Sequence, residues 1–296
     1  MSLVPHATEL LFALGLGDQV VGVTHECDHP SEARELPHVT RDLLPAGLSA
    51  AEIDREVKER TQRGEAIYGL DEEAVRDLEP DLIVTQELCP VCAVSYDEVA
   101  ELALDLPTCP QVVALDPHTF GETMGDARTI AQITGTREAA IELVKRTRAR
   151  VDAVRRAVRE RPPVRVAAIE WFDPVFVAGH WTPQLVEWAG GEDLLGLAGE
   201  RSQETTWEAV AAVAPEVVVA MPCGYDAQTA YREAEMHADA LRATGARRVV
   251  AVDGGAYFSR PGPRLIDGLE LMAHILHPDA VPDPPPGAEA VEVDVA

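Results

Sequence analysis

The chain contains one pattern twice, at positions 135 residues apart. Residues 73–84 read EAVRDLEPDLIV and residues 208–219 read EAVAAVAPEVVV, with Glu-Ala-Val, a proline, an acid and an aliphatic run at the same spacing. A proline disfavours helix in the residue before it, so each copy predicts a helix that ends before the proline and a buried strand that follows it. This duplication predicts two similar lobes with equivalent loops after equivalent strands.

Short β-branched runs alternate with helical patterns through most of the chain. The runs are QVVGVT, DLIVT and QVVALD in the first half, and VRVAAIEW, EVVVAM and RRVVAVD in the second. Strands that alternate with helices require crossover connections and form mainly parallel sheets. We therefore predict an α/β protein with two lobes, each built on a mainly parallel sheet.

A long helical pattern separates the two halves. Thr136 is a suitable N-cap and two prolines, Pro162 and Pro163, end the pattern. Its apolar residues are predicted to share one face: Ile141, Val144, Val151, Val154 and Val158. A rod of about 37 Å favours a stiff spacer between the lobes over a crossover within one sheet, the alternative being an ordinary surface helix that runs long. The predicted parts are an N-terminal lobe at 1–135, a connecting helix at 136–161, a C-terminal lobe at 162–278 and an acidic, proline-rich, mobile tail at 279–296.

The charge and hydropathy of the chain limit which partners it can bind and in which cellular compartment it is expected. Acids outnumber bases by 51 to 25, which argues against a nucleic-acid surface and is compatible with a high-salt environment. No apolar run is long enough to span a membrane, and the start of the sequence has no basic region like that of a signal peptide. As written, the chain is expected to be cytoplasmic, or extracytoplasmic if its natural N-terminus carries a signal sequence.

Chemically distinctive residues gather just after the predicted strands. In open α/β sheets ligands bind beyond the carboxyl ends of the strands, so these segments are the predicted walls of a cleft between the lobes. Four of the five cysteines lie there, namely Cys27, Cys89, Cys92 and Cys223, whereas Cys109 precedes a strand. Several aromatic residues lie there too, namely Trp171, Phe172, Trp181, Tyr225, Tyr257 and Phe258. Flat side chains of this kind suit a large, partly apolar ligand.

The sequence resembles the helical-backbone class of periplasmic-type substrate-binding proteins, the ABC-transporter components that bind cobalamin, ferric siderophores and haem. The matching stretches are SLVPHATELLFALGLGDQVVGVTHECDHP, LDEEAVRDLEPDLIV, FVAGHWTPQLVEWAGGEDLLG and AYFSRPGPRLIDGLELMAHILHP. VTHECDHP is most similar to the cobalamin-binding branch. The resemblance implies two α/β lobes bridged by one long helix.

The resemblance also implies roles for single residues. Glu73 and Glu208 match the surface glutamates with which family members dock on a membrane permease, although both also suit the first turn of a helix. His6 lies beside the cleft in the family pattern and is a candidate ligand contact, the alternative being an exposed residue of a helix cap. Arg260 is a candidate for pairing with ligand carboxylates or phosphate.

The cysteines leave three interpretations open. Thiolates at Cys27, Cys89, Cys92 and Cys223 suit zinc or an iron–sulfur cluster, with His25, Glu26, His29 and His180 as further ligands. In the second interpretation, a thiolate or imidazole approaches the cobalt of a bound corrinoid. The third interpretation is that the cysteines are buried small hydrophobes or a disulfide.

Our leading hypothesis from the sequence is a non-enzymatic, monomeric binding protein for a corrinoid or a related metal chelate, which delivers its ligand to an ABC-transporter permease. The alternative is a cytoplasmic metalloprotein, conceivably an enzyme, whose cysteines hold zinc or an iron–sulfur cluster. A chelatase-like enzyme is a third idea that rests on analogy of fold alone. No nucleophile pattern typical of hydrolases is present.

Overall fold

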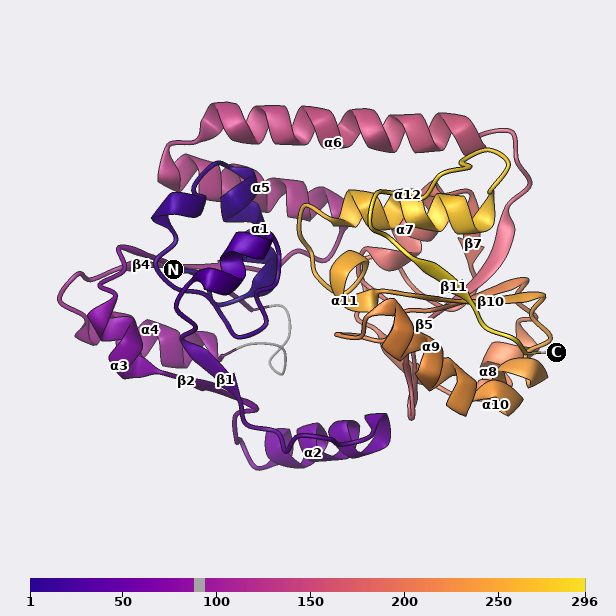
Figure 1. The fold of residues 1–296 in the computed structure, drawn as a ribbon, viewed down its shortest axis with the longest axis horizontal. Helices are drawn as coiled ribbons and strands as arrows, with labels where there is room; N and C mark the ends of the chain where they lie inside the picture. The colour runs from indigo at the N-terminus through magenta and orange to yellow at the C-terminus, as the bar shows by residue number, and fades with distance from the viewer. Residues whose placement is uncertain (88–93, 296) are drawn as a thin grey trace. The chain divides into compact units, whose positions relative to one another are not determined.

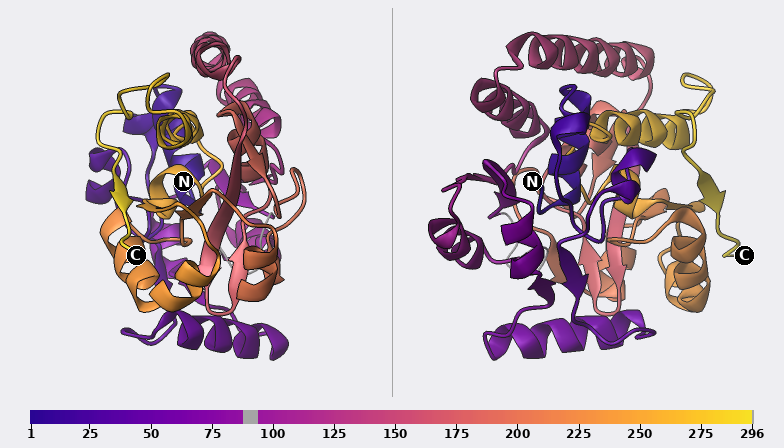
Figure 2. Two further views of the ribbon diagram at one scale, coloured as in Figure 1. Left: turned by 90° about the vertical axis from the view of Figure 1, so that its right-hand side faces the viewer. Right: turned by 60° about the vertical axis from the view of Figure 1, so that its left-hand side comes forward.

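The structure is a computed structural model that describes residues 1–87 and 94–295. It divides into two compact units: unit 1 comprises Met1–Pro117 and Met124–Leu143, and unit 2 comprises His118–Thr123 and Val144–Ala296. One helix, α6 (Arg137–Val158), begins in unit 1 and continues without a break into unit 2 (Figures 1 and 2). Its 22 residues give a rod of about 33 Å, slightly shorter than the sequence predicted.

Unit 1 contains a ladder of parallel segments. β3 (Leu82–Gln86) pairs in parallel with β4 (Gln111–Leu115). The N-terminal residues lie on the other side of β3, where Leu3 N donates to Val84 O at 2.8 Å. Ser2 N in turn donates to Gly22 O at 2.9 Å, and Val23 forms a single parallel bridge with His38. The predicted strand at 19–24 therefore enters the ladder only through these two residues.

Helices cover both faces of this ladder. α1 (Pro5–Ala13) and α5 (Phe120–Thr134) contribute to the hydrophobic cluster around Val84, whereas α3 (Glu72–Asp77) and α4 (Tyr96–Asp105) contribute to the cluster around Ile83. Adjacent residues of a strand point to opposite faces, so β3 supplies both cores. Unit 1 is thus a three-layer α/β unit.

A helical excursion interrupts the antiparallel pair β1 (Thr40–Asp42) and β2 (Tyr68–Leu70). It carries α2 (Ala50–Gln62), which starts with a capping box in which Ser49 and Glu52 each accept from the other's backbone N–H. Two short 3₁₀ helices, η1 (Gly17–Gln19) and η2 (Ser31–Glu35), lie earlier in the chain. The excursion returns the chain so that Tyr68 lies opposite Asp42 and Leu70 opposite Thr40.

Unit 2 is built on a seven-stranded mixed sheet with the order β11-β10-β9-β5-β6-β8, and β7 pairs with β5 off this path. The parallel strands are β7 (Gly191–Asp193), β5 (Val164–Phe172), β9 (Val217–Ala220) and β10 (Arg248–Val252). The antiparallel strands are β6 (Val175–Val177), β8 (Gln203–Thr205) and β11 (Ala290–Glu292). The predicted parallel strands form the centre of the sheet, and short antiparallel strands extend it on both sides.

Helices also cover the sheet of unit 2 on both sides. α8 (Trp207–Ala212), α9 (Ala227–Met236) and α10 (Ala238–Ala243) share a hydrophobic cluster with alternate residues of β5, β9 and β10. α7 (Thr182–Trp188) packs on β5 and β7, and α12 (Leu265–Leu276) packs on α7. The short α11 (Gly254–Tyr257) follows β10 directly.

The duplicated sequence pattern has the same local structure in both units. α3 begins after the N-cap Asp71 and α8 after the N-cap Thr206, and each cap side chain accepts from the backbone three residues on. The residue before each proline then takes a positive φ, 45° at Glu79 and 48° at Ala214. These equivalences, all 135 positions apart, agree with the two helix–strand units that the sequence predicted.

The boundaries of the units differ from those expected. Residues 118–123 belong to unit 2 because Gln184 accepts a hydrogen bond from Phe120 N at 3.1 Å, and Trp188 packs edge-on against the Phe120 ring at 5.3 Å. On α6, Ile141 is 67% exposed, because Ala140 takes the position that faces the core.

The C-terminal segment, expected to be a mobile tail, is ordered where it meets the sheet. β11 pairs antiparallel with β10, as Figure 1 shows in yellow, and Val293 is buried in the cluster of unit 2. Pairing with β10 gives β11 backbone hydrogen bonds at the edge of the sheet. These bonds outweigh the tendency of a polar segment to stay unpaired.

Candidate functional site

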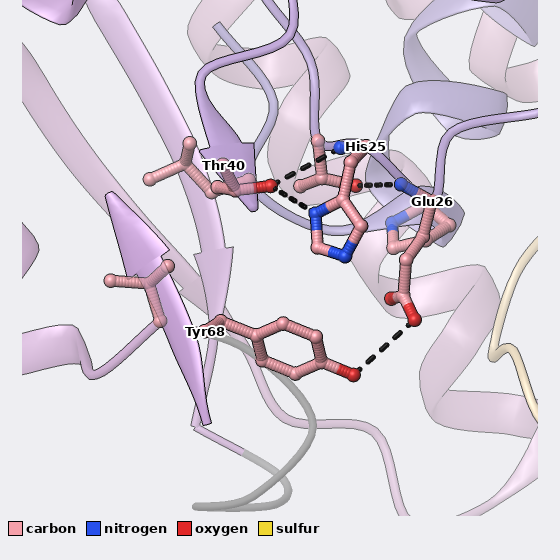
Figure 3. Close-up of a pocket in the computed structure, with 8 residues that line it drawn as sticks. His25, Glu26, Thr40 and Tyr68 are labelled. Carbon is pink, nitrogen blue, oxygen red and sulfur yellow. Dashed lines mark hydrogen bonds between the residues drawn. The ribbon is translucent and has the colours of Figure 1, made fainter. Parts of the chain in front are cut away.

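A pocket in unit 1 lies at the carboxyl ends of its parallel segments (Figure 3). Leu3, Thr24 and Thr40 line it and follow the ladder residues Ser2, Val23 and His38 by one or two positions. The other lining residues are Pro5, His25, Glu26, Tyr68 and Val94. The empty space of about 210 Å³ includes the part open to solvent, so the enclosed part of the pocket is smaller. Sites that enclose a whole small molecule measure roughly 300–1,000 Å³, so this pocket does not enclose one.

Hydrogen bonds fix the polar side chains of this pocket. The Oγ1 of Thr40 lies 2.7 Å from His25 Nδ1 and accepts from His25 N at 3.2 Å. Tyr68 donates its hydroxyl to the carboxylate of Glu26 at 3.2 Å, and its ring centroid lies 5.4 Å from that of His25. Figure 3 shows the His25 ring between Thr40 and Tyr68, and Glu26 pointing toward the Tyr68 hydroxyl. The pocket therefore combines an oriented imidazole, a phenol ring and an exposed carboxylate.

Cys27 lies behind this pocket and is only 2% exposed. Its Sγ lies 3.1 Å from Thr8 Oγ1 and 3.1 Å from Thr24 Oγ1. The thiol is thus held inside unit 1 by two hydroxyl groups. His6 is also buried, in the first turn of α1, rather than exposed as one interpretation of the sequence had it.

Unit 2 has an aromatic pair at the carboxyl ends of β5 and β9. The rings of Trp171 and Tyr225 lie 5.6 Å apart at an angle of 58°. The indole N–H of Trp171 is buried and has no hydrogen-bond acceptor among the residues that the structure describes. Burial, followed by the nearby charge of Glu233, raises the pKa of the Tyr225 phenol, so this hydroxyl is a neutral hydrogen-bonding group. Cys223 is exposed on the same loop, and its backbone N–H donates to Glu170 O at 3.1 Å.

Charged groups follow β10. Asp253 caps α11 by accepting from Ala256 N at 2.6 Å, and burial raises the pKa of its carboxyl group although Arg264 and Arg260 oppose that shift. The guanidinium of Arg264 lies 5.9 Å from the centroid of the Tyr257 ring. Arg260 is partly exposed beside them. This end of unit 2 therefore presents guanidinium groups and a phenol, a set that suits an acidic or polar ligand group.

Three of the predicted aromatic ligand contacts lie in the interior. Phe172 belongs to the hydrophobic cluster and contacts the rings of Trp207 and His237 at 5.7 Å and 5.2 Å. Trp181 donates its indole N–H to Phe258 O at 2.7 Å, and both residues are buried. The structure thus brings Trp171 and Tyr225 together as a pair, while Phe172, Trp181 and Phe258 pack within unit 2.

The proposed thiolate metal set is only partly covered by the structure. Cys89 and Cys92 lie outside the described residues. Within residues 1–87 and 94–295, no three His, Cys, Asp or Glu side chains are gathered in a way that could hold a metal ion. The zinc and iron–sulfur interpretation therefore gains no support from the part of the chain that is described.

The two candidate docking glutamates occupy equivalent places. Glu73 and Glu208 are both exposed, and each is the second residue of its short helix, α3 or α8. Hydrogen bonds from its own backbone N–H and from Thr206 lower the pKa of the Glu208 carboxyl group, which keeps it charged.

Among the pocket residues of unit 1 that sequence reasoning missed, two hydrogen-bond with His25 and Glu26. Thr40 and Tyr68 orient His25 and Glu26, yet they are far from both along the chain. The only available signal was that Thr40 follows a short apolar stretch, which is too weak to place a side chain.

Two α/β units through which one continuous helix passes define the class of helical-backbone binding proteins. The chain belongs to the periplasmic binding protein family, whose pattern matches residues 2–253.

Named relatives extend this result. An ABC-transporter substrate-binding lipoprotein of Bacillus subtilis, YvrC, is 25% identical over 94% of this chain and 80% of its own length. A vitamin B12-binding protein of Yersinia pestis is 25% identical over 74% of this chain and 68% of its own length. A solved periplasmic haem-binding protein of Pseudomonas aeruginosa superposes with a TM-score of 0.69 at 20% identity, covering 99% of this chain and 94% of its own. The predicted fold class and family are confirmed.

A helix must be both long and apolar to cross a bilayer, and none of the described helices is.

Proposed function

We propose that the protein binds a corrinoid such as cobalamin, or a related metal chelate, and delivers it to the permease of an ABC transporter. Membership of the periplasmic binding protein family supports a binding role. The relatives' names support the ligand class, because one is a vitamin B12-binding protein and a solved structure of the same fold is a haem-binding protein. Both ligands are large, flat metal chelates.

The observation that carries this proposal is the aromatic pair Trp171 and Tyr225 at the strand ends of unit 2. Aromatic faces bury a large area at a low cost in side-chain entropy, which suits a flat macrocycle. The buried indole N–H of Trp171, with no acceptor in the described part of the chain, supplies a donor for a polar group on the ligand. Tyr257 and Arg260 extend the proposed surface with a phenol and a positive charge. We also propose His6, in the first turn of α1, as a ligand contact.

Delivery is proposed to use the paired glutamates. Glu73 and Glu208 are exposed at equivalent places of the duplicated pattern, so they suit a partner that presents the same basic surface twice. Because one relative is a lipoprotein of an ABC transporter and the haem-binding protein is periplasmic, we propose that the protein acts outside the cytoplasm.

Binding is tested by absorbance titration with cyanocobalamin, cobinamide and haem, using the intact protein. We expect saturable binding of at least one of them. Trp171→Phe removes the indole donor but keeps an aromatic ring. It is expected to weaken binding about tenfold, because the ligand acceptor is left without its partner, which costs about 1–3 kcal/mol. Trp188→Phe is the matched control, because Trp188 packs against Phe120 and Arg155 rather than at the strand ends. If the protein binds none of the three ligands, the proposal is overturned.

Docking is tested in proteoliposomes that contain the cognate ABC transporter. The double variant Glu73→Arg/Glu208→Arg is expected to keep its affinity for the ligand but to lose stimulation of the transporter's ATPase activity. Stimulation equal to that of the unmodified protein would show that these glutamates do not dock.

A further inference from the structure

The part of α6 that belongs to unit 2 is basic, although the protein as a whole is strongly acidic. Residues 144–161 contain eight of the 25 bases of the chain and two of its 51 acids, a net charge of +6. The other residues carry −32, which gives the net charge of −26 for the whole chain. Seven of the eight bases are exposed, the exception being Arg150. Positive charge is therefore concentrated on the surface of one helix.

Four of the exposed bases follow one line along this helix. We call Lys145, Arg148, Arg156 and Arg159 the basic stripe. At 3.6 residues per turn they fall within an arc of about 80° and extend over about 21 Å. Asp152 lies in the same arc, so the line carries three net positive charges. The stripe is thus long, narrow and predominantly basic.

The arginines of the stripe are not used within the fold. Arg148, Arg156 and Arg159 are exposed, and none of them forms an ion pair with an acid of the described chain. Arg150, on another side of the helix, does bind acids of α12, which lies below this half of α6 in Figure 1. Acids outnumber bases two to one in this protein. Three neighbouring arginines without an acid beside them therefore keep their charge available for a partner.

The surface around the stripe favours recognition by charge alone. Within residues 144–161 the exposed apolar residues are Ala149, Ala153 and Ala157, and the valines are buried, except that nothing larger than alanine is exposed among them. Protein–protein interfaces have an apolar core, and a helix that inserts into a bilayer needs an exposed apolar face. This surface has neither. Guanidinium groups pair with phosphate through two parallel hydrogen bonds, so an array of phosphates is a suitable partner.

We infer that the basic stripe is a docking surface for the phosphate headgroups of an anionic membrane. A bilayer surface is flat and presents phosphates throughout, so a straight line of arginines contacts it along its whole length. The Debye length is about 8 Å at physiological salt, so acids on the far side of unit 2 are screened, whereas arginines in contact with the surface are not. Nucleic acid also presents phosphates, but the proposed location outside the cytoplasm, on which this inference rests, favours a membrane.

The test is flotation of the intact protein with phospholipid vesicles in about 0.1 M NaCl. Vesicles that contain phosphatidylglycerol and phosphatidylcholine are compared with vesicles of phosphatidylcholine alone. We expect the protein to float only with the anionic vesicles and to be released by about 1 M NaCl. Each basic residue near an anionic surface contributes about fivefold to binding. The triple variant Arg148→Gln/Arg156→Gln/Arg159→Gln is therefore expected to bind roughly 100-fold more weakly.

The matched control is the triple variant Arg55→Gln/Arg128→Gln/Arg201→Gln. It removes the same charge from exposed positions outside residues 144–161, so it is expected to float like the unmodified protein. Titration of the same samples with cyanocobalamin and haem is a separate measurement, and neither variant is expected to change it. A failure of ligand binding therefore overturns the proposed ligand without deciding whether the stripe docks on a membrane, which flotation alone decides.

Four outcomes overturn the inference. The first three are no flotation with anionic vesicles, equal flotation with neutral vesicles, and an equal loss of flotation in both triple variants. The fourth comes from analytical ultracentrifugation at the same salt concentration. Self-association that the stripe variant loses, without binding to vesicles, would show that the stripe binds the acidic surface of a second copy of the chain.

Discussion

Asp193 is a buried carboxyl group of unit 2 whose two oxygens have different surroundings. Its Oδ1 accepts from the backbone N–H of Leu195 at 3.1 Å and of Gly196 at 2.8 Å. Its Oδ2 is buried and has no hydrogen-bond partner among the described residues. Burial raises the pKa of this group, although the two backbone hydrogen bonds oppose the shift. The charged form is therefore less stable in the folded protein than in the unfolded chain.

This difference predicts a dependence of stability on pH. Because the folded pKa lies above the unfolded value of about 3.9, the folded state binds more protons between the two values, and stability falls as pH rises through that window. Asp193→Asn keeps the Oδ1 acceptor and removes the charge. We expect it to raise the free energy of unfolding by on the order of 1 kcal/mol at pH 7 and to have little effect near pH 3.

Urea denaturation at the two pH values measures this effect. Asp239→Asn is the matched control, because the Asp239 side chain is fully exposed beside Arg242. An equal change in stability from Asp193→Asn at both pH values would show that the charge of Asp193 is not the cause.

At the scale of elements, one arginine ties the long helix to α12. Arg150 of α6 donates from Nε to Glu270 at 2.7 Å, and from a terminal nitrogen to Asp267 at 2.5 Å and to Glu270 at 2.6 Å. A bidentate pair with a second carboxylate is stronger than a single exposed ion pair. This contact lies within unit 2, so it fixes the C-terminal part of α6 on that unit.

Arg150→Ala is expected to lower the free energy of unfolding by about 1–2 kcal/mol, because it also leaves two carboxylates facing each other. Arg148→Ala, at an exposed position of the same helix, is expected to change it by less than about 0.5 kcal/mol. Chemical denaturation followed by circular dichroism compares the two variants. Equal effects would mean that the tether does not stabilise unit 2.

Local sequence patterns predicted the elements that depend on local interactions. Caps, prolines and aliphatic runs predicted the two helix–strand copies and the long helix. The aliphatic runs also predicted five strands, namely β3, β4, β5, β9 and β10. Elements that form only through distant pairing were missed. β11 exists because Ala290–Glu292 meets β10, and nothing in its own sequence indicates this pairing.

The same distinction applies to the site. Both Trp171 and Tyr225 were predicted from their placement after strands, and their rings lie 5.6 Å apart at one end of unit 2. It did not reveal that Trp181 donates to Phe258 in the interior, because the side of a helix that faces the core depends on its tertiary neighbours. Tyr68 reaches Glu26 from 42 positions along the chain, a contact that a single sequence does not encode visibly.

At the scale of the whole molecule, the dominant property is a net charge of −26. Like charges of this number repel one another in the compact state, and added salt screens that repulsion. We expect the thermal midpoint to rise by several degrees between 0.05 M and 0.5 M NaCl, since roughly 2–4 °C corresponds to each kcal/mol for a unit of this size. Calorimetry measures the change. A midpoint that stays constant or falls would show that favourable ion pairs outweigh the repulsion.

The central claim is that the strand ends of unit 2, with the paired rings of Trp171 and Tyr225, hold a corrinoid or related metal chelate. A crystal structure of the protein grown with cyanocobalamin tests it most directly. We predict that the corrin ring contacts Trp171 and Tyr225. A corrin ring bound away from both residues would contradict the claim.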